Sequence, residues 1–196
     1  MSSGARGGPA LGTRLGRRLL LLVAGAALAV AGLAGAEPPG AIRFTATNLV
    51  ATAEGEFHDW RIVQATVDDA DPGRSRVEVE VALASLDTKN RSRDEHLRSE
   101  DFFDVARFPT ARAILEGFRL EGADGFVADV TLDLHGVSRT FPMRFRIVDR
   151  EARRISGKVT LDRTQWGIGE PYTRWVPLSI RNEVELRVET TVPPSR

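Results

Sequence analysis

Apolar and polar residues alternate through most of the chain after residue 40. In residues 76–83, for example, the odd positions are Val, Val, Val and Leu, whereas the even positions are Arg, Glu, Glu and Ala. Successive side chains of a β-strand point to opposite faces of a sheet, so this period of two predicts a strand with one buried face. The same pattern recurs in residues 126–135, 141–148, 155–161 and 184–188.

Three less regular runs, residues 42–50, 56–67 and 111–120, raise the expected number of strands to eight. Turn-forming residues separate the runs, including Asp71-Pro72-Gly73 and Gly136. Long strands with one apolar face and short connections favour an antiparallel arrangement, and closing the sheet would remove its edges. We therefore predict an all-β fold, an antiparallel lipocalin-like barrel of about eight strands.

Residues 87–108 interrupt the alternation and predict a short helical insertion. Ser92 and Glu95 have the spacing of a capping box, and Pro109 disfavours a helix at the residue before it. We expect one or two short helices here. Their apolar side chains would cap one end of the barrel: Leu97, Phe102, Phe103, Val105 and Phe108.

The N-terminal segment has the pattern of a secretory signal. Arg14, Arg17 and Arg18 precede an uncharged apolar stretch, residues 19–33, and a small-x-small site ends at Ala36. This order predicts a signal peptide over residues 1–36, cleavage between Ala36 and Glu37, and a periplasmic or secreted protein. A retained membrane anchor is the alternative, and the export route, general secretory or twin-arginine, stays open. The mature chain then divides into a linker (residues 37–41), one domain (42–192) and a tail (193–196).

Composition narrows the classes of function. The chain has 196 residues, with 27 Lys and Arg against 27 Asp and Glu, and no cysteine. Four arginines and no acid lie in residues 1–36, so the remainder is mildly acidic, which argues against a nucleic-acid or an anionic-membrane partner. The lack of cysteine excludes thiol nucleophiles, disulfides and thiolate metal sites.

No catalytic or metal-binding pattern is present. None of the three histidines, His58, His96 and His135, has a metal-ligand spacing to another, and no G-x-S-x-G elbow occurs. We expect no metal and no enzymatic activity. The alternative is a hydrolase or lyase that acts inside the barrel through His96 or His135, and it requires a histidine that faces the cavity. From the alternation alone, the interior could be either a filled core or an apolar ligand cavity.

Several ordered motifs resemble the YceI-like family of secreted lipocalin-type barrels. They are Ser85-Leu86-Asp87-Thr88, residues 93–99 (RDEHLRS), residues 101–104 (DFFD), residues 132–139 (LDLHGVSR) and residues 163–168 (RTQWGI). Together with the strand at residues 184–188, the likeness spans about residues 42–192. It departs from the family at residues 41–46, where members commonly have an aromatic residue and a His-Ser pair.

The resemblance implies an apolar tunnel that holds a long-chain lipid, a polyisoprenoid or an isoprenoid quinone, for sequestration or transport. It implies no cofactor, a hydrophobic ligand as the main partner and a transient inner-membrane partner. The candidate tunnel residues are Val79, Val81, Leu83, Phe102, Phe103, Phe126, Val130, Leu132, Phe141, Phe145, Trp166 and Leu186. The motif residues with an expected architectural role are Asp87, Asn90, Arg93, Asp94 and Gly136. A filled barrel that regulates a membrane electron-transfer protein is the alternative.

Overall fold

The computed structural model describes residues 39–192. The predicted signal peptide, its cleavage site at Ala36 and Glu37, and the predicted tail therefore lie outside the described residues. In the part of the chain that the structure describes, no helix combines the length and the hydropathy needed to cross a membrane.

The regular structure of the described chain is mostly β-structure, with one short α-helix. The helix is α1 (Arg91–Arg98), and three 3-10 turns are η1 (Pro72–Arg74), η2 (Leu83–Ser85) and η3 (Arg163–Trp166). The strands are β1 (Gly40–Thr47), β2 (Thr52–Phe57), β3 (Trp60–Thr66), β4 (Arg76–Ala82), β5 (Leu86–Asp87), β6 (Thr110–Glu121), β7 (Gly125–Leu134), β8 (Val137–Asp149), β9 (Arg154–Asp162) and β10 (Glu183–Thr191).

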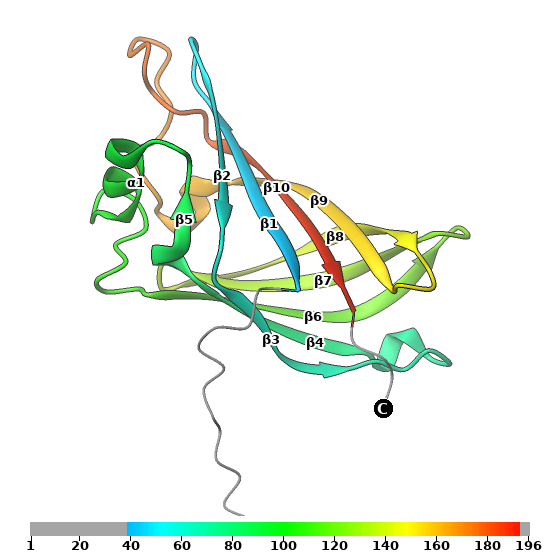
Figure 1. Cartoon of the computed structure of the whole chain (residues 1–196). Coiled ribbons are helices and arrows are strands. Elements are labelled where there is room, and N and C mark those ends of the chain that lie inside the picture. The colour runs from blue at the N-terminus through cyan, green and yellow to red at the C-terminus, as the bar shows by residue number, and fades with distance from the viewer. Residues whose placement is uncertain (1–38, 193–196) are drawn as a thin grey trace, which may run out of the picture. The chain divides into compact units, whose positions relative to one another are not determined.

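All ten strands belong to one antiparallel sheet with the order β3-β4-β6-β7-β8-β9-β10-β1-β2-β5. The sheet is strongly curled, so that β1 and β10 face β4 and β6 across the interior (Figure 1). The predicted antiparallel all-β class and the helical insertion are confirmed. The prediction of a closed barrel of about eight strands is corrected to a half-barrel of ten strands.

The difference in strand number arises where the chain changes partners. The run expected at residues 56–67 is divided at His58 and Asp59, because β2 pairs with β1 and β5, whereas β3 pairs with β4. Backbone hydrogen bonds cross this joint, from Ala82 N to Asp59 O at 2.9 Å and from His58 N to Ser85 O at 3.3 Å. The two-residue strand β5, within a motif segment that has no alternation, supplies the other additional strand.

The alternation correctly assigns the two faces of the strands. On β8, for example, Met143 and Phe145 are buried, and the Arg144 side chain between them is exposed. The Phe145 ring stacks on Phe126 at a centroid distance of 5.1 Å. Gly157 leaves room for this ring, because a Cβ at that position would lie 2.5 Å from Phe145 Cδ1. The inner face is therefore apolar and closely fitted around the aromatic rings.

The helical insertion begins two residues earlier than the capping box predicts. Asn90 has an extended backbone, and its Oδ1 accepts a hydrogen bond from Arg93 N at 3.1 Å, so Asn90 is the N-cap and Ser92 lies inside α1. Asparagine is as strong an N-cap as serine, and it precedes the serine here. After Arg98 the chain continues in turns up to β6, so the region holds one α-helix.

The β7–β8 hairpin turns on His135 and Gly136, both with positive φ (51° and 76°). A two-residue loop with positive φ at both positions matches the right-handed twist of the flanking strands. Phe108 packs beneath this turn, with its ring 4.7 Å from the His135 ring, and a Cβ on Gly136 would lie 2.9 Å from Phe108. Phe108 thus packs against this turn and does not line the interior, in contrast to its expected capping role.

Candidate functional site

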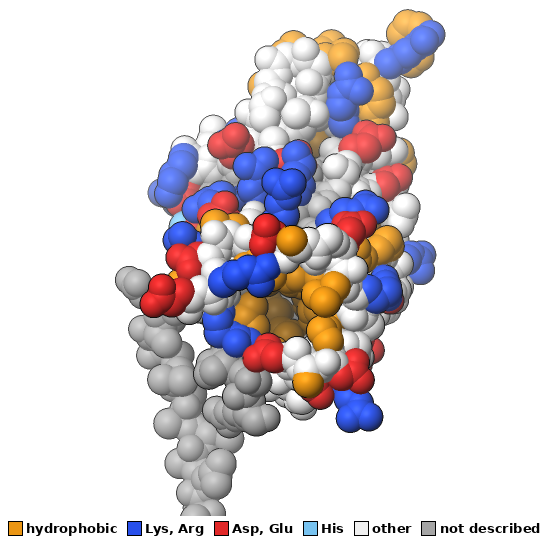
Figure 2. Space-filling view, turned by 90° about the vertical axis from the view of Figure 1, so that its right-hand side faces the viewer, with side chains coloured by type: hydrophobic (Ala, Val, Ile, Leu, Met, Phe, Trp, Pro, Cys, Tyr) orange, Lys and Arg blue, Asp and Glu red, His pale blue; other side chains and the backbone are white. Residues whose placement is uncertain are grey.

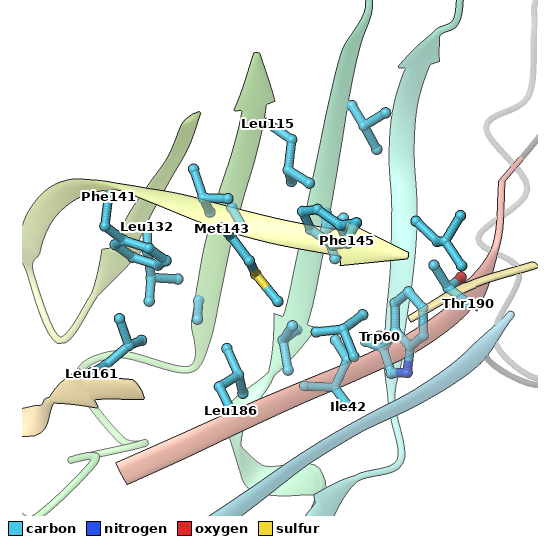
Figure 3. Close-up of a pocket in the computed structure, with 18 of the residues that line it drawn as sticks. Ile42, Trp60, Leu115, Leu132, Phe141, Met143, Phe145, Leu161, Leu186 and Thr190 are labelled. Atoms are coloured by element: carbon cyan, nitrogen blue, oxygen red, sulfur yellow. The ribbon is translucent and has the colours of Figure 1, made fainter. Parts of the chain in front are cut away.

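The inner face of the curled sheet encloses a cavity of about 590 Å³. Side chains from β1, β3, β4 and β6 to β10 point into it, and the labelled residues in Figure 3 converge on its interior from opposite walls. Apart from its two ends, the wall is built almost wholly of aliphatic and aromatic side chains. The space falls within the range of about 300–1,000 Å³ that small-molecule pockets occupy.

All twelve residues predicted for the tunnel line this cavity: Val79, Val81, Leu83, Phe102, Phe103, Phe126, Val130, Leu132, Phe141, Phe145, Trp166 and Leu186. Trp166 is almost fully buried, and its Nε1 donates a hydrogen bond to Leu132 O at 3.2 Å. Its ring meets Phe141 edge to face at 6.2 Å. The structure thus brings the candidates together, while their contact with a ligand stays a prediction.

Sequence reasoning missed part of the wall. Ile42 and Phe44 are buried on the inner face of β1, and Phe57 and Trp60 flank the joint between β2 and β3. The signal for the first pair was present, because Ile42, Phe44 and Ala46 alternate with polar residues. No comparable signal marks Phe57 and Trp60, since the alternation breaks where the strand changes partners.

One end of the cavity opens among the turns that follow β3 and β8, and we call this end the mouth. Figure 2 shows the hollow from this side, with apolar walls and charged side chains around the rim. The charged residues that line it are Asp68, Asp69, Arg150 and Arg153. Arg153 Nη2 lies 3.3 Å from Asp69 Oδ1, and Arg150 Nη2 lies 2.7 Å from Asp124 Oδ1. The rim therefore carries paired charges of both signs.

The opposite end is closed by the helical insertion and by the chain that follows β9. Leu97, Phe102 and Phe103 line the cavity here, beside the buried Arg163. The Arg163 guanidinium donates hydrogen bonds to four backbone carbonyls: Arg181 O at 3.1 Å, Glu170 O at 2.7 Å, Ile180 O at 2.8 Å, and Ile168 O. Desolvation by burial lowers the pKa of Arg163 from its ordinary value. This arginine thus fastens the loop between η3 and β10 to the end of the cavity.

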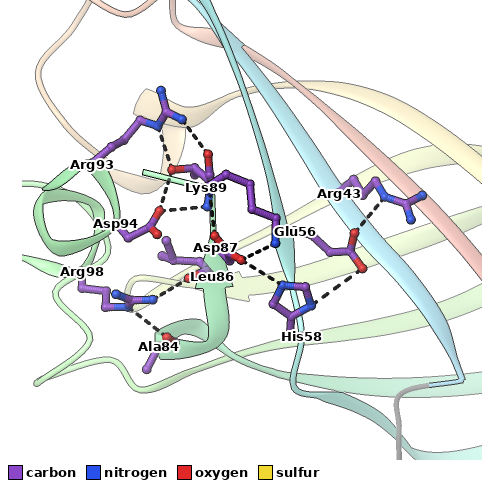
Figure 4. A network of polar contacts seen from close by, with 11 residues as sticks. Arg43, Glu56, His58, Ala84, Leu86, Asp87, Lys89, Arg93, Asp94 and Arg98 are labelled. Atoms are coloured by element: carbon purple, nitrogen blue, oxygen red, sulfur yellow. Dashed lines mark hydrogen bonds and ion pairs between the residues drawn. The ribbon is translucent and has the colours of Figure 1, made fainter. Parts of the chain in front are cut away.

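The polar motif residues form a separate network outside the cavity (Figure 4). Asp94 is buried and accepts hydrogen bonds from Thr88 N at 2.9 Å and from Thr88 Oγ1 at 2.6 Å. Arg93 Nε donates to Thr88 Oγ1 at 2.7 Å. These bonds fix the turn that leads from β5 into α1, so the motif holds in place the helix that closes one end of the cavity.

Asp87 belongs to the same network on the outer surface. Its Oδ2 lies 2.6 Å from Lys89 Nζ and 3.5 Å from His58 Nε2, and its Oδ1 accepts from Lys89 N at 2.7 Å. The side-chain hydrogen bond from Lys89, together with the one from its backbone, lowers the pKa of Asp87 to about 2. Asp87 therefore remains a carboxylate at any physiological pH, and its contacts position the chain around Lys89.

The three histidines all lie away from the cavity wall. His58 lies near Glu56 and Asp87, His96 Nε2 is 3.4 Å from Asp101 Oδ2, and His135 Nδ1 is 3.0 Å from Trp166 O. A hydrolase or lyase that acts through His96 or His135 inside the barrel lacks the inward histidine it requires. Within residues 39–192, no three His, Asp, Glu or Cys side chains gather into a group that could hold a metal ion.

The sequence of the chain is similar to a known domain family and to bacterial relatives. Residues 38–192 match the YceI-like domain. A UPF0312 protein of Pseudomonas fluorescens is 34% identical over 126 residues, which is 60% of this chain and 64% of that protein. A UPF0312 protein of Pseudomonas savastanoi is 40% identical over 87 residues, 43% of this chain and 44% of that protein. The alignments thus span less than two thirds of these relatives.

Solved structures with low sequence identity share the fold. Burkholderia cenocepacia BcnA aligns with a TM-score of 0.68 at 16% identity, over 76% of this chain and 94% of that chain. A polyisoprenoid-binding domain from Saccharophagus degradans, implicated in plant cell wall breakdown, aligns with a TM-score of 0.54 at 14% identity, over 79% of this chain and 94% of that chain.

Proposed function

Because the chain belongs to the YceI-like domain family and its curled sheet encloses an apolar cavity, we propose that it binds a long-chain lipid of the polyisoprenoid or isoprenoid-quinone class. The observation that carries the proposal is the cavity of about 590 Å³ between the two walls of the sheet. The similarity in fold to the polyisoprenoid-binding domain from Saccharophagus degradans supports the choice of ligand class.

The chemistry of the wall suits a hydrocarbon chain. Each buried methylene is worth ~0.8 kcal/mol, so about ten buried carbons contribute on the order of 8 kcal/mol before the cost of association. Apolar contact alone therefore supplies a large part of the binding free energy. Specificity would depend mainly on the length and width of the tunnel, and the charged groups are confined to its ends.

A binding protein that sequesters or carries its ligand fits this site better than an enzyme does. The cavity wall presents no histidine, and its acidic side chains, Asp68 and Asp69, lie at the mouth. The filled-core regulator of a membrane electron-transfer protein predicts a packed interior, which is at odds with a cavity of this volume. The signal-like pattern of residues 1–36 supports a location in the periplasm.

Filling part of the cavity should weaken ligand binding without disturbing the outer surface. Ala113 lines the cavity from the middle of β6, so an indole at this position would occupy part of the space. If Ala113→Trp displaces about three ligand carbons, the loss is ~2.4 kcal/mol, or about 60-fold in Kd. Equilibrium binding of a radiolabelled long-chain polyprenol would measure the change.

The next residue along the chain provides a control in which the same side chain, tryptophan, is introduced on the other face of the strand. Ile114 points to the other face of β6 and is not among the residues that line the cavity. Ile114→Trp should bind the polyprenol as the parent does, and thermal unfolding would show that both variants are folded. Equal affinities of a folded Ala113→Trp variant and the parent protein would mean that the ligand does not enter this cavity.

A further inference from the structure

Most of the large apolar side chains that are exposed on the described surface lie at one end of the molecule. Eight such side chains are exposed within residues 39–192, and five of them lie in two short segments. These are the β1–β2 turn (residues 48–51) and the loop between η3 and β10 (residues 171–181), which together we call the tip. The five residues are Leu49, Val50, Trp175, Val176 and Leu178. Trp175 is 78% exposed, although tryptophan is usually largely buried.

The two segments of the tip are neighbours in space. Arg181 N donates a hydrogen bond to Thr47 O at 2.8 Å, which joins the end of the loop to the end of β1. Both segments project from the same end of the sheet, away from the mouth (Figure 1). The exposed apolar residues therefore lie on two neighbouring projections at one end of the sheet. Isolated apolar side chains on a surface require no explanation, but a gathered group marks an interaction site.

The loop of the tip is ordered by specific hydrogen bonds. Tyr172 N donates to Asn182 Oδ1 at 2.7 Å, and Thr173 N donates to Ser179 Oγ at 2.9 Å. Arg163 holds both ends of the loop through Glu170 O at 2.7 Å and Ile180 O at 2.8 Å. Trp175 is thus exposed on a loop that hydrogen bonds hold in one conformation, so its side chain is presented without the help of a partner.

The charged side chains of the tip are all basic, although the chain after residue 36 is mildly acidic as a whole. Residues 45–53 carry no charged side chain, and residues 171–182 contain two arginines and no acid. The Arg174 guanidinium lies 4.2 Å from the centroid of the Trp175 ring, and that of Arg181 lies 5.6 Å from the centroid of Tyr172. The rim of the mouth differs, because its arginines are paired with acids. The tip therefore combines aromatic, aliphatic and basic groups without acidic ones.

We propose that the tip docks on the surface of an anionic phospholipid membrane. Tryptophan and tyrosine favour the boundary between headgroups and acyl chains, leucine and valine favour the acyl region, and arginines are attracted to anionic headgroups. Ile180 lines the cavity from the end of this loop, and Ile168 lines it from the segment between η3 and the loop, so the membrane contact adjoins the closed end of the lipid site. Membrane contact does not depend on the cargo and goes beyond the proposed lipid binding.

Tryptophan fluorescence gives a local test in the full chain. Trp60 and Trp166 are 4% and 2% exposed, whereas Trp175 is 78% exposed, so Trp175 is the tryptophan that a membrane surface can reach. With vesicles of phosphatidylcholine and phosphatidylglycerol, the emission of Trp175 should shift to shorter wavelength, and brominated phospholipids should quench it. Vesicles of phosphatidylcholine alone should give a much weaker response. Trp60 and Trp166 line the cavity and would respond to lipid that enters it, so a Trp175→Phe variant supplies the background. Only the part of the response that is lost in this variant is assigned to Trp175.

Charge-removal variants test the electrostatic part. Arg174→Gln combined with Arg181→Gln should partition about 30-fold more weakly into the anionic vesicles, which corresponds to ~1 kcal/mol for each arginine near the surface. Arg61→Gln combined with Arg144→Gln removes two exposed arginines of the outer face and should partition as the parent does. Three results would overturn the proposal: no quenching of Trp175, an equal response to neutral vesicles, or a lipid-independent dimer that buries Trp175. Loss of polyprenol binding would leave these readouts unaffected.

Discussion

Phe145→Asp should be the most damaging single substitution in the wall of the cavity. Phe145 is 4% exposed and stacks on Phe126. Removing a buried phenylalanine side chain costs about 3–5 kcal/mol, and a carboxyl group in an apolar interior adds a desolvation penalty. Domains of this size are stable by only about 5–15 kcal/mol, so we expect a largely unfolded protein. Urea denaturation followed by far-ultraviolet circular dichroism would measure the effect.

The neighbouring residue supplies the control for this substitution. The Arg144 side chain is 77% exposed and lies 3.0 Å from Glu121. An exposed ion pair contributes about 0–1 kcal/mol, so Arg144→Ala should unfold at nearly the same urea concentration as the parent. If both substitutions had equal effects, the assignment of the two faces of β8 would be contradicted, and with it the apolar wall.

Arg163→Leu should have the second largest effect, at the closed end of the cavity. The leucine would leave four carbonyl groups without their guanidinium donor, namely the buried carbonyl of Ile168 and the partly buried carbonyls of Glu170, Ile180 and Arg181. Hydrogen bonds to a charged donor are worth about 1.5–3 kcal/mol each, and entering water can replace some of them. We expect a loss of about 3 kcal/mol or more in the free energy of unfolding.

Hydrogen exchange would locate this effect within the chain. Amides in residues 170–181 should exchange faster in Arg163→Leu, whereas those of β7 and β8 should respond only to the global loss of stability. Arg187→Leu is a suitable control, because Arg187 is an exposed residue of β10 that pairs with Glu185. Unchanged exchange in the loop of an Arg163→Leu variant would contradict the role of Arg163 in fastening it.

Sequence periodicity predicts the walls of this fold well. Where a strand keeps one neighbour on each side, as β8 does between β7 and β9, alternation assigns each side chain to the correct face. It fails at His58 and Asp59, because a change of partner strand leaves no mark in the hydrophobic pattern. The capping box predicts a helix start two residues too late, since Asn90 and Ser92 are both competent caps and only the backbone geometry distinguishes them.

The sequence predicts the ends of the cavity less well than its walls. Arg163 bonds to backbone carbonyls of residues 168–181, and carbonyl groups have no signature in the sequence. Residues 175–178 (Trp-Val-Pro-Leu) form an apolar run, and such a run does not predict that Trp175 is exposed. By contrast, all twelve predicted tunnel residues line the cavity, and for the eight that lie on β4, β7, β8 and β10 the inward orientation follows from the strand period.

Native mass spectrometry of the protein purified from its own cells tests the central claim most directly. The account predicts a bound hydrophobic molecule whose fragments differ by isoprene units, lost in the Ala113→Trp variant and retained in the Ile114→Trp variant. Protein obtained without ligand should take up added polyprenol, and a ligand at 100 times its Kd should raise stability by ~2.7 kcal/mol. Repeated preparations without lipid, together with no stabilisation by polyprenol, would contradict the account.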